Sequence, residues 1–156
     1  MKDNLKLKDE LLETIKRYNL PSYKELDSEF EISNIEQDGY LLRAIRRKMI
    51  EKLEFFCKII ESLIFPDTSS LAALQESKIL DDEKRTQLLK LYKKLMIYDR
   101  ISLSLEIDND DKKNIKIIND LFQEWEEIKP QLMDLVKGMT DSWSKDDESL
   151  EEKYFG

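Results

Sequence analysis

The chain has 156 residues, enough for one domain with a hydrophobic core, and a formal net charge of −8. Three glycines and three prolines are too few turn residues for a fold of many short strands, so the composition predicts an all-α protein. The absence of histidine and the single cysteine, Cys57, exclude histidine-dependent catalytic triads, metal and haem sites that need histidine, intrachain disulfides and cysteine zinc sites.

Residues 1–39 are expected to form an N-terminal helix followed by an acidic arm. Apolar residues at helical spacing, including Leu11 and Ile15, predict a helix over 4–18. After Pro21, apolar and acidic residues nearly alternate, which predicts a short strand or an extended arm instead of a helix. The apolar residues of this arm either pack on the protein's own core or bind a partner protein, and both alternatives stay open for Leu26, Phe30 and Ile32.

Residues 40–144 are expected to form the helical core. A broad apolar stripe predicts a long helix over 40–64, and a cap among residues 67–69 predicts a short helix around 71–74. A third long helix is predicted to begin after a cap at Asp81 or the residue that follows it.

Residues 101–107 fit two patterns. They alternate in a way that is typical of a strand, and they also continue the apolar stripe of the third helix. We favour the continued helix, because the strand would have to pair with residues 28–33 in a two-stranded ribbon, which is only marginally stable without further packing.

The strongest periodicity lies in the last helix, which is predicted from a cap at 108–110 to about Ser144. In a heptad frame, eight of nine core positions are apolar, and a third apolar column widens the stripe enough for burial in a bundle. Pro130 removes one backbone hydrogen bond but keeps the phase, so a kinked continuous helix is predicted. The first core column is Ile115, Phe122, Lys129, Val136 and Trp143, the second is Ile118, Trp125, Leu132 and Met139, and the third is Leu121, Ile128 and Leu135.

Three long helices that fold back on one another predict an antiparallel bundle, to which the N-terminal helix and a short connecting helix are added. The acidic tail over residues 145–156 is expected to fray. No internal repeat is found, so residues 1–39, 40–144 and 145–156 are expected to be parts of a single domain.

A basic run on the second helix is the most unusual local feature of the sequence. Residues 40–64 carry a net charge of +3 in this acidic chain, and Arg43, Arg46 and Arg47 share one helical face. Arginine presents a planar fork to an oxyanion, so these residues are candidates for binding the phosphates of a nucleic acid. Acidic residues of a protein partner or of segment 25–38 could neutralise them equally well, and the acidic remainder of the chain favours this alternative.

The distal half of the last helix is a candidate protein-binding surface. Its aromatic and aliphatic residues continue the core stripe, and burial within the bundle is the simplest explanation of them. If this half extends beyond the other helices, the same stripe presents a ridge or groove to a partner helix. The candidate residues are Leu132, Val136, Met139 and Trp143.

An all-α enzyme without histidine would use carboxylates to hold magnesium, with acidic residues three apart on facing helices. Glu51 and Glu54 have this spacing, and they match the Glu-x-x-Glu half of a motif in all-helical nucleotide pyrophosphohydrolases similar to the MazG family. No Glu-x-x-Asp follows at a suitable distance, and a chain with 34 acidic residues contains such pairs by chance. A magnesium-dependent phosphohydrolase is therefore the last of the alternatives.

Taken together, these features favour a non-catalytic helical protein–protein interaction module, an adaptor or complex subunit that needs no cofactor. Nucleic-acid association through the arginine face is the second hypothesis. A homodimer is left open, because the apolar stripe of the last helix could extend beyond its intramolecular cover. No segment has the ~20 apolar residues of a membrane span or the pattern of a signal peptide, so a cytoplasmic protein without a membrane partner is expected.

Overall fold

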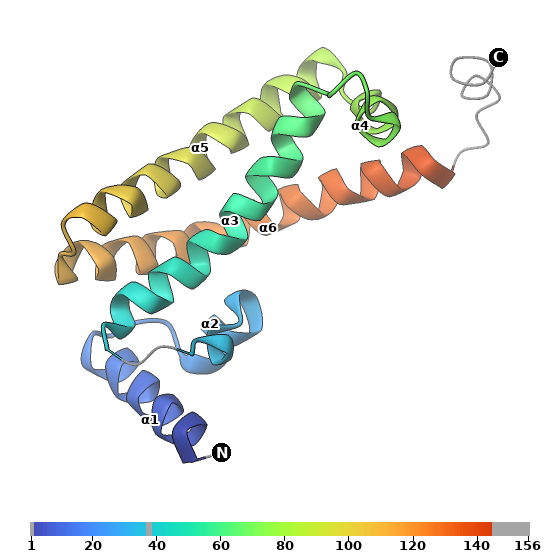
Figure 1. Ribbon diagram of the computed structural model, residues 1–156. Helices are drawn as coiled ribbons and strands as arrows, with labels where there is room; N and C mark the ends of the chain where they lie inside the picture. Colours follow the sequence, from blue (N-terminus) through green and yellow to red (C-terminus); the bar gives the residue numbers. More distant parts are fainter. Residues whose placement is uncertain (1, 37–38, 145–156) are drawn as a thin grey trace, which may run out of the picture.

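The computed structural model describes residues 2–36 and 39–144, and the tail predicted to fray lies outside the described residues. The described chain is all-α, as predicted, and contains no strand (Figure 1). Its elements are α1 (Lys2–Arg17), α2 (Tyr23–Phe30), the 3-10 helix η1 (Ile32–Asn34), α3 (Leu41–Ile64), α4 (Leu71–Ser77), α5 (Asp82–Ile107) and α6 (Asp111–Ser144).

The three long helices α3, α5 and α6 form the core of the fold, which confirms the predicted bundle. α3 packs against both α5 and α6, and each long helix runs back relative to the one before it (Figure 1). α5 and α6 are joined by a short turn at 108–110 and separate toward their other ends, where α4 packs beside the distal part of α6. α1 and α2 pack on each other and on α3.

Side-chain caps begin the helices close to the predicted places. Asp81 accepts a hydrogen bond from the backbone N–H of Lys84 at 2.7 Å, and Asp110 accepts one from the backbone N–H of Lys113 at 2.9 Å. α4 is capped by Ser70, one residue beyond the predicted range of 67–69. α6 continues through Pro130, so its predicted continuity is confirmed.

The segment 101–107 belongs to α5, which confirms the favoured alternative. Ser102 and Leu105 continue the buried stripe of Leu95 and Tyr98, so this end of the helix packs on the bundle like the rest of it. Packing along this whole stripe explains why the helical pattern prevails over the strand-like alternation.

α6 buries a different face from the one that the heptad frame predicts. Its second and third columns are buried from Ile118 to Leu135, whereas its first column is half-buried or exposed. Val136 is 40% exposed and Trp143 is 47% exposed. The helix packs against α3, α5 and α4 and not against one partner helix, so its buried arc is centred between the second and third columns.

The acidic arm is helical, and the predicted strand or extended arm is wrong. Ser22 and Glu25 form a capping box, in which each side chain accepts a hydrogen bond from the backbone N–H of the other. α2 ends where Glu31 adopts a left-handed conformation with φ of 57°. Leu26 and Phe30, four residues apart, are both buried. The capping box was the sequence signal for this helix.

Two carboxylates lie close together where α3 packs on α5. Burial, together with the hydrogen bond and the charge of Asp99, raises the pKa of Glu54 above its ordinary value. The Asp99 side chain is 13% exposed and forms an ion pair with Arg100. Burial is also the main reason that the pKa of the Cys57 thiol rises to about 11, which makes Cys57 an unreactive structural thiol at neutral pH.

Glu54→Gln is expected to raise the melting temperature at pH 7. A carboxyl group with a higher pKa in the folded state stabilises the fold below its unfolded pKa, and this stabilisation is lost as the pH rises through the folded pKa. The ionised Glu54 is therefore unfavourable at pH 7, and the neutral amide removes the penalty. Thermal unfolding as a function of pH should show the advantage disappearing below about pH 4. Glu127→Gln, an exposed change on α6, is the control, and a lower melting temperature of E54Q at pH 7 would contradict the prediction.

Candidate interaction site

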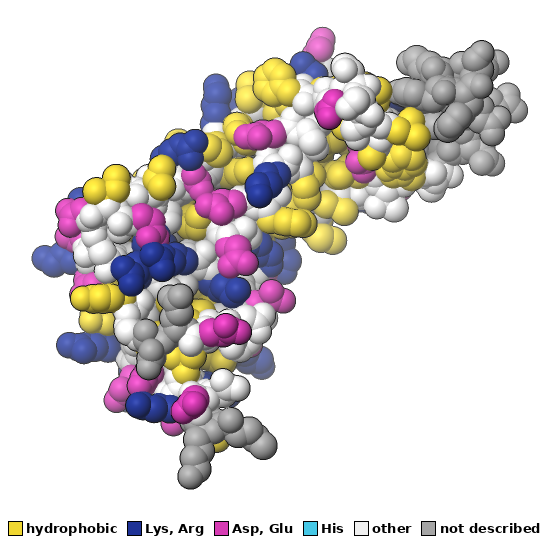
Figure 2. Space-filling view, viewed as in Figure 1, with side chains coloured by type: hydrophobic (Ala, Val, Ile, Leu, Met, Phe, Trp, Pro, Cys, Tyr) yellow, Lys and Arg dark blue, Asp and Glu magenta, His cyan; other side chains and the backbone are white. Residues whose placement is uncertain are grey.

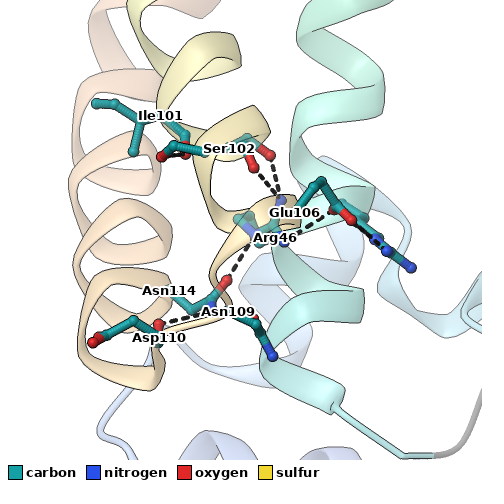
Figure 3. Close-up of polar contacts among 9 residues, drawn as sticks. Arg46, Ile101, Ser102, Glu106, Asn109, Asp110 and Asn114 are labelled. Carbon is teal, nitrogen blue, oxygen red and sulfur yellow. Dashed lines mark hydrogen bonds and ion pairs between the residues drawn. The ribbon is translucent and has the colours of Figure 1, made fainter.

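The arginine run of α3 lies beside the turn between α5 and α6, and its central residue is buried. Arg46 is 1% exposed. Its guanidinium donates to the side-chain oxygen of Asn114 at 2.6 Å and to the carbonyl and hydroxyl oxygens of Ser102, and it pairs with Glu106 at 3.0 Å (Figure 3). Ser102 and Glu106 belong to α5 and Asn114 to α6, so one buried cation joins all three long helices.

Glu106 is shared by two arginines. Arg47 donates to both oxygens of this carboxylate, from Nε at 2.7 Å and from Nη2, while Arg46 approaches one of them. The hydrogen bond from Arg47, opposed by partial burial and assisted by Arg46, lowers the pKa of Glu106 to about 2. Burial lowers the pKa of Arg46, but the paired carboxylate opposes this change. The buried guanidinium is thus held by an ionised partner at neutral pH.

Asn114 connects this network to the turn at 108–110. Its side chain is buried and accepts from Arg46. Its amide nitrogen donates to the side-chain oxygen of Asn109 at 2.8 Å and to the backbone carbonyl of Asp110 at 2.9 Å (Figure 3). Both amide hydrogens and the oxygen of Asn114 are therefore used, as a buried amide requires.

These contacts overturn the hypothesis that the three arginines present one anion-binding face. For Arg46 and Arg47 they agree with the favoured alternative, neutralisation by an acidic residue. Arg46 is enclosed by the protein, and Arg47 is held by Glu106. The partner is also not the acidic segment 25–38 but a glutamate 59 residues after Arg47. One sequence signal was available: Arg46 is three residues before Met49 and seven before Leu53, which places it on the apolar stripe of α3.

Arg43 occupies a different position from the other two arginines. Its guanidinium lies over the ring of Tyr40, 5.1 Å from the ring centre, and it lines a polar hollow of about 460 Å³. Arg17 lines the same hollow, but so do the acidic residues Glu13 and Asp111. The charges in this hollow are mixed, which does not favour a polyanion.

The three candidate residues of the acidic arm lie in the core. Leu26 and Ile32 are fully buried and Phe30 nearly so. The ring of Phe30 packs on Trp125 of α6 with 5.1 Å between the ring centres. The arm therefore packs on its own domain, and these side chains are not free to bind a partner.

Polar contacts strengthen the attachment of α2 to the bundle. The carboxylate of Glu29 accepts from Nε1 of Trp125 at 2.7 Å and from Nζ of Lys129 at 2.8 Å, and the Lys129 hydrogen bond is the main reason that the pKa of Glu29 is lowered. Lys52 of α3 donates to the backbone carbonyl of Glu29 and lies over the Trp125 ring. α2 is thus bound to both α3 and α6.

The four candidate residues in the distal half of α6 lie in different environments. Leu132 is buried, and Met139 is half-buried against the core. Val136 and Trp143 are exposed. Figure 1 shows this half of α6 extending past the other long helices, with α4 beside it.

A groove lies on the other flank of distal α6. It has a volume of about 280 Å³ and runs between α6, the start of α5 and the connection from α4 to α5. Gly138 allows the close approach of α6 to this connection, because a Cβ atom there would lie 3.3 Å from Cδ1 of Ile79. The residues that make the groove apolar are Ile79, Leu80, Leu88, Leu91, Leu135 and Gly138.

Within residues 2–36 and 39–144, no group of three or more cysteine, aspartate and glutamate side chains is placed to hold a metal ion. In the same part of the chain, none of the helices is both long and apolar enough to cross a membrane.

Comparisons with known proteins leave the site to be interpreted from its own geometry. No protein-family model matches the chain, and neither the curated proteins nor the solved structures contain a significant match.

Proposed function

We propose that this protein is a non-catalytic helical interaction module that binds a helix of a partner protein through the distal half of α6. The observation that carries this proposal is the apolar groove beside Leu135 and Gly138. Amphipathic helices bind in such grooves by inserting apolar side chains spaced three, four and seven residues apart.

The shape of the groove supports a helix as its occupant. Its volume of about 280 Å³ is at or below the lower end of the range for pockets that enclose a small molecule, about 300–1,000 Å³. Its walls are α5, α6 and the segment that connects α4 to α5. The buried position of Arg46 removes the main support for the nucleic-acid alternative.

The proposed binding surface lies in the distal half of α6, as the sequence predicts, but other residues of this half make the contacts. At about 100° per residue, Val136 and Trp143 are turned about 140–160° from Gly138 around the axis of α6, so they lie on a different flank from the groove. Leu132 and Met139 support the groove from within the core. The direct contacts are assigned to Leu135 and Gly138.

Two matched tryptophan variants on α6 test this proposal. Asp134→Trp places a bulky side chain in the groove, and Thr140→Trp places the same side chain on the exposed opposite flank. Tagged protein is used to capture partners from a nuclease-treated native lysate, and cross-linking mass spectrometry locates the contact. We expect a stoichiometric protein cross-linked beside the groove, recovered equally by wild type and T140W and at least tenfold less by D134W.

Three results would refute the groove as the binding site. They are recovery of the bait alone, recovery that depends on nucleic acid, and a partner whose recovery is the same with D134W as with wild type. Circular dichroism of both variants checks that the helical fold is retained.

A further inference from the structure

α5 carries large aliphatic residues on its outer side as well as on the side that packs on the bundle. Its buried residues include Leu88, Leu91 and Leu95. Five further large aliphatic side chains are exposed, among them Ile97 at 61% and Ile107 at 88%. A surface helix normally carries mainly polar residues on its outer side, so exposed aliphatic residues there are candidates for contact with a partner. Between Leu89 and Ile107, the outer face of α5 carries these five aliphatic residues together with Lys90, Lys93, Arg100 and Ser104.

The aliphatic residues of the outer face lie in two columns along the helix, on either side of Lys93 and Arg100. Leu89 and Leu103 are fourteen residues apart, with the half-buried Met96 midway between them, so these three residues lie in one column. Ile97 and Ile101 lie one turn apart in a neighbouring column. Together the two columns form a strip that is about 27 Å long from Leu89 to Ile107, at 1.5 Å per residue. It is on the opposite side of α5 from the groove.

The charges of the outer face are basic. α5 carries six basic and four acidic residues, in a chain whose net charge is −8. Of the acidic residues, Asp82 and Glu83 lie at the start of the helix and Glu106 at its end, so Asp99 is the one acidic residue between Lys84 and Leu105. Asp99 is largely buried and paired with Arg100. Lys90 and Lys93 have no acidic partner within the described residues. Figure 2 shows hydrophobic and basic side chains, with acidic ones among them, along the edge of the molecule that α5 forms in Figure 1.

We infer that the outer face of α5 binds an acidic amphipathic helix of a partner protein. Such a helix places its apolar stripe on the strip from Leu89 to Ile107 and its acidic flanks beside Lys90, Lys93 and Arg100. A partner segment of about 18 residues matches the length of the strip. This surface is separate from the groove and does not depend on it.

Charge complementarity favours this occupant over two others. A second copy of the chain that docked through the same face would place lysines and arginines opposite one another. An anionic membrane would attract this face, but the net charge of −8 and the acidic residues Glu54 and Glu61 of the neighbouring α3 oppose adsorption. An acidic helix of a protein is narrow enough to contact the basic strip alone.

Fluorescence anisotropy with a synthetic peptide tests the inference. The probe is a labelled 20-residue helical peptide with leucines three and four residues apart on one face and glutamates beside them. A second peptide keeps the leucines and replaces the glutamates with lysines. Full-length wild-type protein should bind the acidic peptide and not the basic one. The double variant Lys93→Glu/Arg100→Glu and the single variant Ile97→Asp should each weaken binding at least tenfold.

The control is Lys137→Glu, an exposed charge reversal on α6, which should leave the affinity unchanged. Failure of the wild type to bind the acidic peptide would overturn the inference, as would equal binding of both peptides or binding that survives both α5 changes. Binding of phosphatidylserine-containing vesicles through the same residues, or dimerisation in sedimentation that Ile97→Asp abolishes, would assign the face to a membrane or to a second copy. The groove variant Asp134→Trp should bind the acidic peptide normally, so failure here is separable from failure of the proposed function.

Discussion

Replacing Glu106 with alanine is expected to lower the free energy of unfolding by about 3 kcal/mol, near the low end of the 3–5 kcal/mol typical of breaking a buried ion pair. The loss is large because Arg46 stays buried without an opposite charge, and its hydrogen bonds to Ser102 and Asn114 do not replace the carboxylate. The low end applies because Glu106 is itself 33% exposed, so water screens part of the attraction. Urea denaturation at neutral pH measures the change.

Two further variants identify the buried charge as the cause. Arg47→Ala removes the more exposed partner of the same carboxylate and should cost no more than about 1 kcal/mol. Arg46→Met in the Glu106→Ala background removes the buried guanidinium that has lost its carboxylate partner, and the methionine fills much of the same space. The double variant should therefore be more stable than Glu106→Ala alone. A double variant less stable than the single one would show that Arg46 does not need its charge neutralised.

Trp125→Ala is expected to lower the free energy of unfolding by about 3–5 kcal/mol, the range for truncating a buried aromatic residue to alanine. Trp125 is 4% exposed, packs on Phe30 and donates to Glu29. Its loss leaves a cavity between α2 and α6, so hydrogen exchange of the backbone amides of α2 should accelerate more than that of α5.

Trp125→Phe and Trp143→Ala are the controls for this effect. Phenylalanine keeps most of the packing and loses the Nε1 hydrogen bond, which predicts a cost of about 1 kcal/mol. Trp143 is the other tryptophan of α6 and is 47% exposed, so its truncation should change stability by no more than about 0.5 kcal/mol. Similar losses for Trp125→Ala and Trp143→Ala, or uniform acceleration of exchange, would contradict the role of Trp125 in holding α2.

The long helices were predictable because their signals are local. Apolar residues at helical spacing and the carboxylates of Asp81 and Asp110 act within one or two turns, so they can be recognised without knowledge of the fold. The short helix α2 was missed although Ser22 and Glu25 mark its beginning. Eight residues are too few to form a stable helix alone, and burial of Leu26 and Phe30 on the bundle stabilises it.

The candidate sites were less predictable because they depend on which surfaces the bundle covers. The sequence shows that Leu132 and the three arm residues are apolar, but it leaves open whether they pack in the core or bind a partner. The packing of α2, α3 and α6 decides this, because it buries all four side chains. The groove combines residues of the connection between α4 and α5 with residues of α5 and α6, which come together only in the folded bundle. The exposed strip on α5 could have been found from the Ile and Leu residues on both sides of that helix, read together with its lysines.

The sequence by itself determined the fold class, the three long helices and most of their caps, because periodicity and capping involve residues only a few positions apart. The tertiary structure alone decided that Arg46 is an interior charge, since its partners at 102, 106 and 114 lie 56 to 68 residues away along the chain. It likewise decided which apolar residues of α5 and α6 stay exposed. Burial is a property of the assembled helices, and the spacing of residues within one helix does not contain it.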